Sequence, residues 1–309
     1  SVNELLEKLH REDFANILIF ITHHTKDSWV LIEIQKVLKN LFESHDAASL
    51  ARNQLAFMND FMKKIPDLVI EQREIQNERD EHNDKLDQLE RNEDLNEGES
   101  HDFLANINKA FKGIEIAGQI IRNRHATLTR NSLSELADCG VSTGLRFLKY
   151  FIEISDSAKK EIVKMIALHL AEFPDLSDRE IEKQAENAYL HLTYGVINSV
   201  VRKIASSIGS KEALEIYFDL EDKKKTPAFT LIRQSIELQF NKRLDVKSLE
   251  KSVEYLHENP VGIRILKEMV VQHIYMFPVD YKEKQKLSSM LGISIQGQRF
   301  LDQRKLGKG

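Results

Sequence analysis

Residues 103–121 read FLANINKAFKGIEIAGQII, and this stretch already indicates the fold class. Its apolar residues recur every three or four positions, which places them on one face of a helix. Gly113 and Gly118 lie inside the pattern, so we expect another helix to approach closely there. The stretch predicts an amphipathic helix over about residues 102–127, and the apolar residues of the pattern are Phe103, Ile107, Phe111, Ile114, Ala117, Ile121 and Leu128.

The same spacing recurs along most of the chain. It includes Trp29 and Ile32 near the N-terminus, and it continues from Asp46 to Ile65. The run Phe14–Ile21 fits a buried strand as well as a buried helix; we interpret it as a helix because no partner strand is found. Further helices, with ends marked by proline, glycine or a capping box, are predicted over about residues 131–153, 156–172, 178–206, 210–222, 227–241, 246–258, 260–277 and 281–291.

The composition agrees with a helical protein. The 309 residues include only 12 glycines and 5 prolines, about half the usual share. β-Sandwiches, barrels and Rossmann folds need frequent turn residues, so the composition argues against these classes. No repeat of fixed period is found. We therefore predict an all-α fold, an irregular array of packed helix pairs that resembles helical-repeat proteins.

Cysteine usage and hydropathy bear on the compartment. Cys139 is the one cysteine, so no intramolecular disulfide forms and a reducing compartment is the default. No run of about 18 apolar residues occurs, and the N-terminus has no basic region before an apolar core. We expect a cytoplasmic protein with no membrane contact. Because the chain starts at Ser1 and ends with Lys308 and Gly309, we also expect a fragment of a longer protein.

Charge is unevenly distributed along the chain. The total is −5, yet residues 71–102 carry 13 acidic and 4 basic residues, which leaves the remainder net positive. A segment with its own charge sign often lies outside the core. We predict a protruding charged helix near residues 67–91. The predicted organisation is an N-terminal helical subdomain containing this acidic helix (1–91), an acidic linker (92–101), a C-terminal helical array (102–295) and a tail (296–309).

Motifs for catalysis or nucleotide binding are missing. The sequence has no G-x-x-x-x-G-K-[ST] and no G-x-G-x-x-G, and Gly140–Gly144 is the nearest glycine pair. His45-Asp46 could belong to a metal-dependent phosphohydrolase, but Asp46 between two predicted helices is better interpreted as a helix cap. Glu254-x-x-His257 occurs once, whereas a di-iron bundle needs two such motifs. No arginine precedes a histidine by the four to six residues of helical ribonuclease toxins. We expect no catalytic residues, no metal and no cofactor.

Basic residues form the main candidate binding site. Arg122 and Arg124 cluster near a helix end, where positive charge is favourable for structural reasons alone. With Arg202, Lys203 and the run 223–225 they could form one basic face that suits a phosphate backbone. Few exposed aromatic residues are expected beside them, so base stacking has little support. Trp29 is a candidate anchor for a protein partner, although a tryptophan at helical spacing is more often in the core.

Three stretches together suggest a family: KAFKGIEIAGQIIRNR (109–124), RKIASSIGS (202–210) and MFPVDYK (276–282). With ITHH (21–24) and DSW (27–29) upstream, they resemble the C-terminal helical region of bacterial STAND-type P-loop NTPases of antiphage defence. The resemblance implies a parent protein with an N-terminal effector and a central nucleotide-binding module. This chain would then be the sensor or scaffold that recognises a trigger by shape, and no catalytic residue carries over.

The leading hypothesis is a non-enzymatic interaction module that binds a protein trigger or partner domain. Its candidate binding residues are Arg122, Arg124, Arg202, Lys203 and Trp29. Two alternatives stay open, a nucleic-acid-binding helical module and a metal-dependent phosphohydrolase or nuclease. A homo-oligomer is also open.

Overall fold

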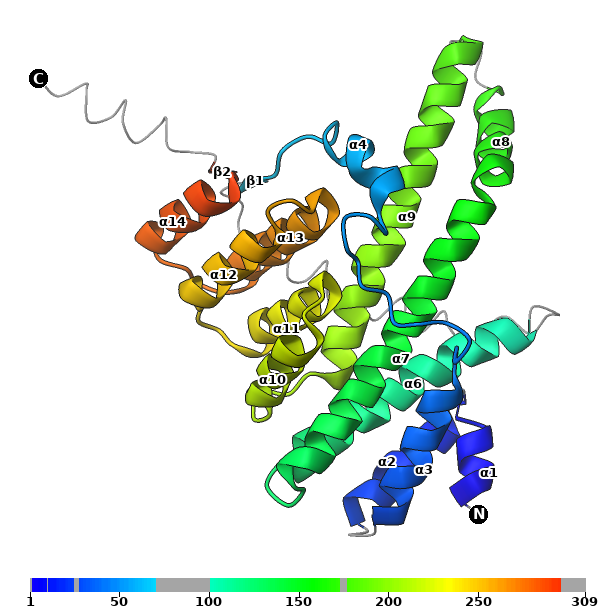
Figure 1. Ribbon diagram of the computed structural model, residues 1–309, viewed down its shortest axis with the longest axis vertical. Helices are drawn as coiled ribbons and strands as arrows, with labels where there is room; N and C mark the ends of the chain where they lie inside the picture. The colour runs from blue at the N-terminus through cyan, green and yellow to red at the C-terminus, as the bar shows by residue number, and fades with distance from the viewer. Residues whose placement is uncertain (1, 10, 25–27, 71–100, 173–176, 296–309) are drawn as a thin grey trace, which may run out of the picture.

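The computed structural model describes residues 2–9, 11–24, 28–70, 101–172 and 177–295. These residues form an all-α protein (Figure 1), which confirms the predicted fold class. The α-helices are α1 (Val2–Glu7), α2 (Glu12–His24), α3 (Ser28–Asn40), α4 (Asn59–Met62), α6 (His101–Arg124), α7 (Arg130–Ser157), α8 (Lys159–Leu170), α9 (Asp178–Ile208), α10 (Leu214–Lys224), α11 (Pro227–Phe240), α12 (Val246–Leu256), α13 (Pro260–Met276) and α14 (Tyr281–Leu291). A 3₁₀ helix, η1 (Ala56–Met58), and two short strands, β1 (Val69–Ile70) and β2 (Ser294–Ile295), complete the elements.

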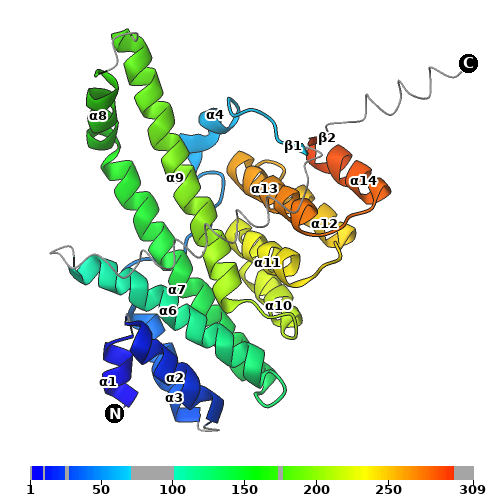
Figure 2. The ribbon, with the colours of Figure 1, turned by 180° about the vertical axis from the view of Figure 1, so that it is seen from behind.

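Helices α6, α7 and α9 cross at the centre of the molecule (Figures 1 and 2). Glycines let the backbones approach closely at this crossing. A Cβ atom on Gly118 would lie 1.9 Å from the carbonyl oxygen of Ser207, and one on Gly144 would lie 2.4 Å from the Ile204 side chain. A Cβ atom on Gly113 would likewise lie 2.7 Å from Leu38. The close approach predicted at Gly113 and Gly118 is therefore confirmed, since only glycine has no Cβ to clash.

The N-terminal helices pack on one side of this crossing. Helix α2 lies against α6, and α3 lies against both α6 and α7. Leu18, Ile34 and Leu38 supply fully buried side chains to this contact. The run Phe14–Ile21 lies in α2, so its interpretation as a helix is confirmed. The described parts of the N-terminal and C-terminal regions share one continuous hydrophobic core.

Helices α10 to α14 pack on the other side of the crossing, where α10, α12 and α13 surround α11 and α14 lies against α12 (Figure 1). Their ends follow the predicted signals. Thr226 caps α11, which begins at Pro227, and the Asn259 side chain accepts a hydrogen bond from Gly262 at the start of α13. The capping box of Ser177 and Glu180 opens α9 as predicted. Local chemistry therefore sets most helix boundaries.

Two predicted helices differ from the structure. Residues 46–55 form no regular helix, because their backbone bonds to distant elements: Ala48 donates to the Leu145 carbonyl at 3.0 Å, and Asn259 donates to the Leu50 carbonyl at 2.7 Å. The charged helix expected over residues 67–91 is wrong at its start. Val69–Ile70 is a strand that pairs in parallel with Ser294–Ile295, as suits β-branched residues. The rest of that helix and the linker up to residue 100 lie outside the described residues, as does the tail from residue 296, whereas His101 begins α6.

No described helix is long and apolar enough to span a membrane.

Candidate interaction site

Arg122 joins α6 to the end of α9. Its Nη1 donates hydrogen bonds to the carbonyl oxygens of Ser207 at 3.1 Å and Gly209 at 2.6 Å. Tyr217 donates to the Ile208 carbonyl between them at 2.6 Å. Carbonyls at a helix C-terminus have no partner within the helix, so a cation there satisfies them and interacts favourably with the helix dipole. Burial lowers the pKa of Arg122. The side chain therefore caps α9 from outside.

Arg202 lies in a polar seam between α9 and α13. Its Nε donates to Asn198 at 3.1 Å, and its Nη1 donates to Gln272. Asn198 in turn donates to Glu268 at 2.8 Å, and Arg264 pairs with the same carboxylate at 2.8 Å. Burial lowers the pKa of Arg202, while the charge of Glu268 opposes that shift. The guanidinium is therefore engaged by one side chain of its own helix and one of α13.

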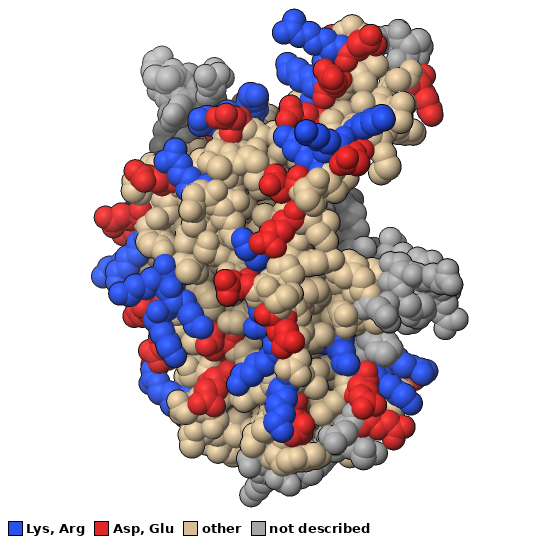
Figure 3. Space-filling view, turned by 45° about the vertical axis from the view of Figure 1, so that its right-hand side comes forward, with Lys and Arg blue, Asp and Glu red and all other residues tan. Residues whose placement is uncertain are grey.

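The other two basic candidates face solvent. Arg124 is partly exposed near the end of α6, and Lys203 is exposed on α9. In the run 223–225, Lys224 forms an ion pair with Asp138 at 2.8 Å. Figure 3 shows charges of both signs mixed over most of the visible face, with basic side chains gathered at one edge. Two of the four basic candidates thus have structural partners, and a binding role for the group stays a prediction.

Trp29 lies on α3 with its side chain 42% exposed. Ile32 follows one turn later and is 48% exposed. On α2, Ile17 and Phe20 are also one turn apart, and they are 46% and 64% exposed. The opposite face of α2 packs on α6, and that of α3 packs on α6 and α7. We call these four residues the α2–α3 outer face; the sequence indicated only Trp29 among them.

A second group of exposed apolar residues occupies the arm formed by α8 with the adjoining ends of α7 and α9 (Figures 1 and 2). Met165 and Leu168 on α8 are 66% and 63% exposed, and Leu192 on α9 is 63% exposed. The sequence reasoning missed them. A signal was present, because the apolar residues of the run 162–170 cover more than one helical face, which a helix packed on one side cannot bury.

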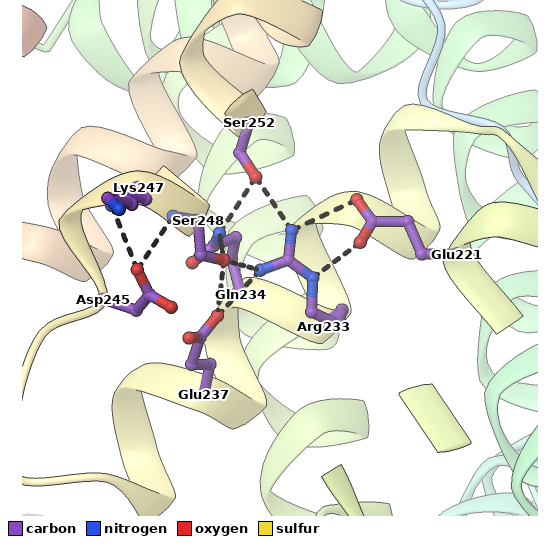
Figure 4. Close-up of polar contacts among 8 residues, drawn as sticks. All are labelled: Glu221, Arg233, Gln234, Glu237, Asp245, Lys247, Ser248 and Ser252. Atoms are coloured by element: carbon purple, nitrogen blue, oxygen red, sulfur yellow. Dashed lines mark hydrogen bonds and ion pairs between the residues drawn. The ribbon is translucent and has the colours of Figure 1, made fainter. Parts of the chain in front are cut away.

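The sequence also did not point to a buried polar cluster around Arg233 on α11 (Figure 4). Its five N–H groups are all used: two bonds go to Glu221 at 2.6 and 3.3 Å, one to Glu237 at 2.8 Å, and two to Ser248 and Ser252 at 2.7 and 3.0 Å. The guanidinium also lies 4.7 Å from the centre of the Phe218 ring. Burial raises the pKa of Glu237, against the opposing effects of Ser248 and Arg233. With every donor satisfied, the cluster holds α10, α11 and α12 together.

The residues weighed for metal binding have other roles or lie apart. No group of three or more potential ligands occurs within the described residues. His45 contacts Glu153 at 3.3 Å and Ser44 at 2.9 Å, and its ring packs edge-on against Tyr150. No helix begins at Asp46, so its predicted capping role is wrong. His257 contacts the backbone of its own turn at 2.6 Å.

No family model matches this chain, and neither the curated proteins nor the solved structures yield a match.

Proposed function

We propose that this chain is a protein-binding module, the sensor or scaffold part of a larger STAND-type NTPase of bacterial antiphage defence. The resemblance in residues 109–124, 202–210 and 276–282 suggests the parent. The partner is a protein trigger that presents apolar side chains, and recognition rests on shape and burial with no chemical step. The cytoplasm of a bacterium is the compartment in which such a sensor would act.

The α2–α3 outer face carries this proposal. Four large apolar side chains, each 42–64% exposed, lie on two helices whose other faces supply the core. Each helix exposes two of these side chains one turn apart, and exposed apolar groups favour binding to an apolar partner surface because their contact with water is unfavourable. Aromatic residues such as Phe20 and Trp29 contribute strongly to protein interfaces. An amphipathic helix of the partner fits such a face.

The basic residues support nucleic-acid binding less well. Arg122 and Arg202, two of the four basic candidates, donate to carbonyl and amide oxygens of this chain. A phosphate would compete with those acceptors. Protein binding through an apolar face also predicts a weak dependence on salt, whereas binding to a phosphate backbone falls steeply as salt rises.

A capture experiment tests the proposal. The tagged chain is incubated with lysates of phage-infected and uninfected bacteria, and bound material is identified by mass spectrometry and by absorbance at 260 and 280 nm. We expect a stoichiometric protein from the infected lysate. Its affinity, remeasured with purified partner, should change by less than about tenfold between low and moderate salt, since few charges are involved.

Two matched variants locate the binding site. Phe20→Asp places a charge on the α2–α3 outer face and should abolish capture. Leu168→Asp changes a residue of equal exposure on the arm, at 63% against 64%, and should leave capture intact. The proposal would be refuted if the Phe20→Asp variant still captured the partner, or if the bound material were nucleic acid that salt releases. If the tagged chain retained nothing from either lysate, the proposal would be refuted for this chain alone.

A further inference from the structure

Residues 46–70 run along the helical array with little regular structure of their own, and we call them the belt. Their regular elements are η1, α4 and β1, which have three, four and two residues. Figure 1 shows the belt running from the side of α3 past α9 to β1, beside α14. Segments of this length with so little regular structure are uncommon in compact proteins and are often functional. The path of the belt must therefore be held by its contacts with the helices.

Three successive belt residues form hydrogen bonds through their backbone to α7, to α11 and to the residue that caps α13. These bonds join Ala48 to Leu145 at 3.0 Å, Ser49 to Ala228 at 2.9 Å and Leu50 to Asn259 at 2.7 Å. The N–H of Ala228 lies in the first turn of α11, where it has no partner within the helix. The side-chain oxygen of Asn259 already caps α13 by accepting from Gly262 at 3.0 Å, so its amide nitrogen serves the belt. The array thus offers an incoming backbone the donors that its own helices leave over, as peptide-binding grooves do.

Belt side chains fill apolar sites on the array. Leu50, Leu55 and Met58 are each 0% exposed. Leu50 is buried with a φ of 53°, a left-handed conformation that leucine rarely adopts. Such a conformation persists only where the surroundings impose it. Leu50 is therefore the anchor of the belt, and the groove determines its backbone conformation.

The second half of the belt is also held by the array. Helix α4 packs on α13, and the ring of Phe61 lies edge-on to His191 of α9, with 6.4 Å between the ring centres. Arg264 of α13 donates to the Pro66 carbonyl at 2.7 Å, and β1 pairs in parallel with β2. Strand addition of this kind is a common way to bind an extended peptide.

The chain on either side of the belt allows it to leave without moving a helix. Residues 71–100 lie between Ile70 and α6, and a stretch of that length can span up to about 100 Å. On the other side, Arg146 donates to the Leu41 carbonyl at 3.1 Å, which fixes the chain before the belt begins. Detachment of the belt therefore requires no change in α3 or α6.

We propose that the belt occupies a peptide-binding groove in cis, and that a protein partner displaces it by presenting an extended segment with a leucine anchor. The groove is formed by α7, α9, α11 and α13, and it supplies the apolar site of Leu50 and the donors of Ala228 and Asn259. Because the belt is tethered, its effective concentration is about millimolar, and the intact protein binds a free segment weakly. The groove is separate from the α2–α3 outer face, so either proposal can fail while the other holds.

A labelled synthetic peptide of residues 44–70, added to the full chain and followed by fluorescence anisotropy, tests the groove. Leu50→Asp in the chain places a charge in a fully buried site and should release the belt. The free peptide should then bind at least about tenfold more tightly than it binds the unaltered chain. Asn53→Asp changes an exposed belt residue and is the matched control, which should bind the peptide as weakly as the unaltered chain. A peptide that itself carries Leu50→Asp should bind none of these proteins, and circular dichroism verifies that each variant is folded.

Hydrogen exchange tests the belt without a disruptive substitution, and it decides the proposal if Leu50→Asp does not fold. The amides of Ala48 and Ala228 lie on different elements but both depend on the belt contact, so they should exchange together and at least about tenfold faster than amides at the centre of α11. Asn259→Asp keeps the oxygen that caps α13 and removes the donor to Leu50, so it should accelerate both amides by roughly fivefold. Equally weak or equally tight peptide binding by the unaltered chain and folded Leu50→Asp would overturn the proposal. So would exchange of Ala48 and Ala228 no faster than that of the centre of α11, because the belt would then be a fixed part of the core.

Discussion

Helices α11 and α8 are similar in length but opposite in their surroundings. All residues from Ala228 to Leu238 in α11 are buried, whereas α8 has no buried residue. Polarity does not account for the difference. Arg233, Gln234 and Glu237 are polar and buried in α11, while Met165 and Leu168 are apolar and exposed in α8. Burial here follows from the position of each helix, because α11 is enclosed by α9, α10, α12 and α13, and α8 packs mainly on α9.

The molecule therefore has a buried region that determines stability and an exposed region that does not. The hub, which is α11 with the helices α9, α10, α12 and α13 around it, is closed, and all five N–H groups of Arg233 in it are hydrogen-bonded. The arm is exposed, and its apolar residues Met165 and Leu168 do not belong to the core. Substitutions in the hub should therefore lower the free energy of unfolding, whereas substitutions of exposed residues in the arm should leave it nearly unchanged.

The largest effect is expected at Arg233. Arg233→Met removes the cation from a buried cluster and leaves the carboxylates of Glu221 and Glu237 without it, which should lower the free energy of unfolding by about 3–5 kcal/mol. Urea denaturation followed by circular dichroism measures the change. Arg243→Met, at an exposed position of the α11–α12 loop, should cost less than about 0.5 kcal/mol. Equal losses in the two variants would remove the distinction between the hub and the surface.

A smaller loss is expected at the helix crossing. Gly118→Ala would place a methyl group 1.9 Å from the Ser207 carbonyl oxygen, so α6 and α9 must move apart, at a cost of roughly 1–3 kcal/mol. Gly195→Ala on α9 is the matched control because no atom lies within 4 Å of its added Cβ. This control should stabilise the protein by about 0.5–1 kcal/mol through helix propensity. The two thermal midpoints should therefore shift in opposite directions, and shifts of the same sign would contradict the model of the crossing.

Arg122 and Arg124 provide the next comparison, since the sequence grouped them as one binding site. Arg122→Gln should cost about 1–2 kcal/mol, because the carbonyls of Ser207 and Gly209 lose a charged donor. Arg124→Gln should cost less than about 0.5 kcal/mol, as is usual for partly exposed side chains. The urea midpoints of the two variants measure these losses of stability. Equal stability of the two would show that the cap at the end of α9 contributes little.

Local signals in the sequence predicted the fold class and most helix boundaries. The apolar spacing of 103–121, the caps at Thr226 and Asn259, and the capping box of Ser177 act over a few residues, and the structure retains them. The irregular path of residues 46–55 could not be predicted in this way. It depends on backbone hydrogen bonds to residues about 100 or more positions away, which leave no periodic trace.

The candidate site was harder to predict for the same reason. In the sequence, Arg122 and Arg202 cannot be distinguished from exposed basic residues. Only their acceptors, which are distant in the sequence, show that both side chains form hydrogen bonds within the chain. Arg233 was overlooked because a polar residue in a helix is assigned to the solvent side by default. By contrast, the exposed residues of α8 could have been predicted, because the apolar residues of 162–170 occupy more than one face of a helix.

Thiol labelling compares a buried position, Cys139, with an exposed one, Leu168→Cys, and this substitution should have the smallest effect on stability. Cys139 is 7% exposed, and burial raises the pKa of its thiol to about 11, so the native protein should react with a thiol reagent at neutral pH only as it unfolds. Leu168→Cys should cost less than about 0.5 kcal/mol. Its thiol should be labelled at once in dilute protein, while Cys139 stays unlabelled in the same sample. Slow labelling of residue 168 would contradict the exposure of α8. Fast labelling of Cys139 would contradict the closed core.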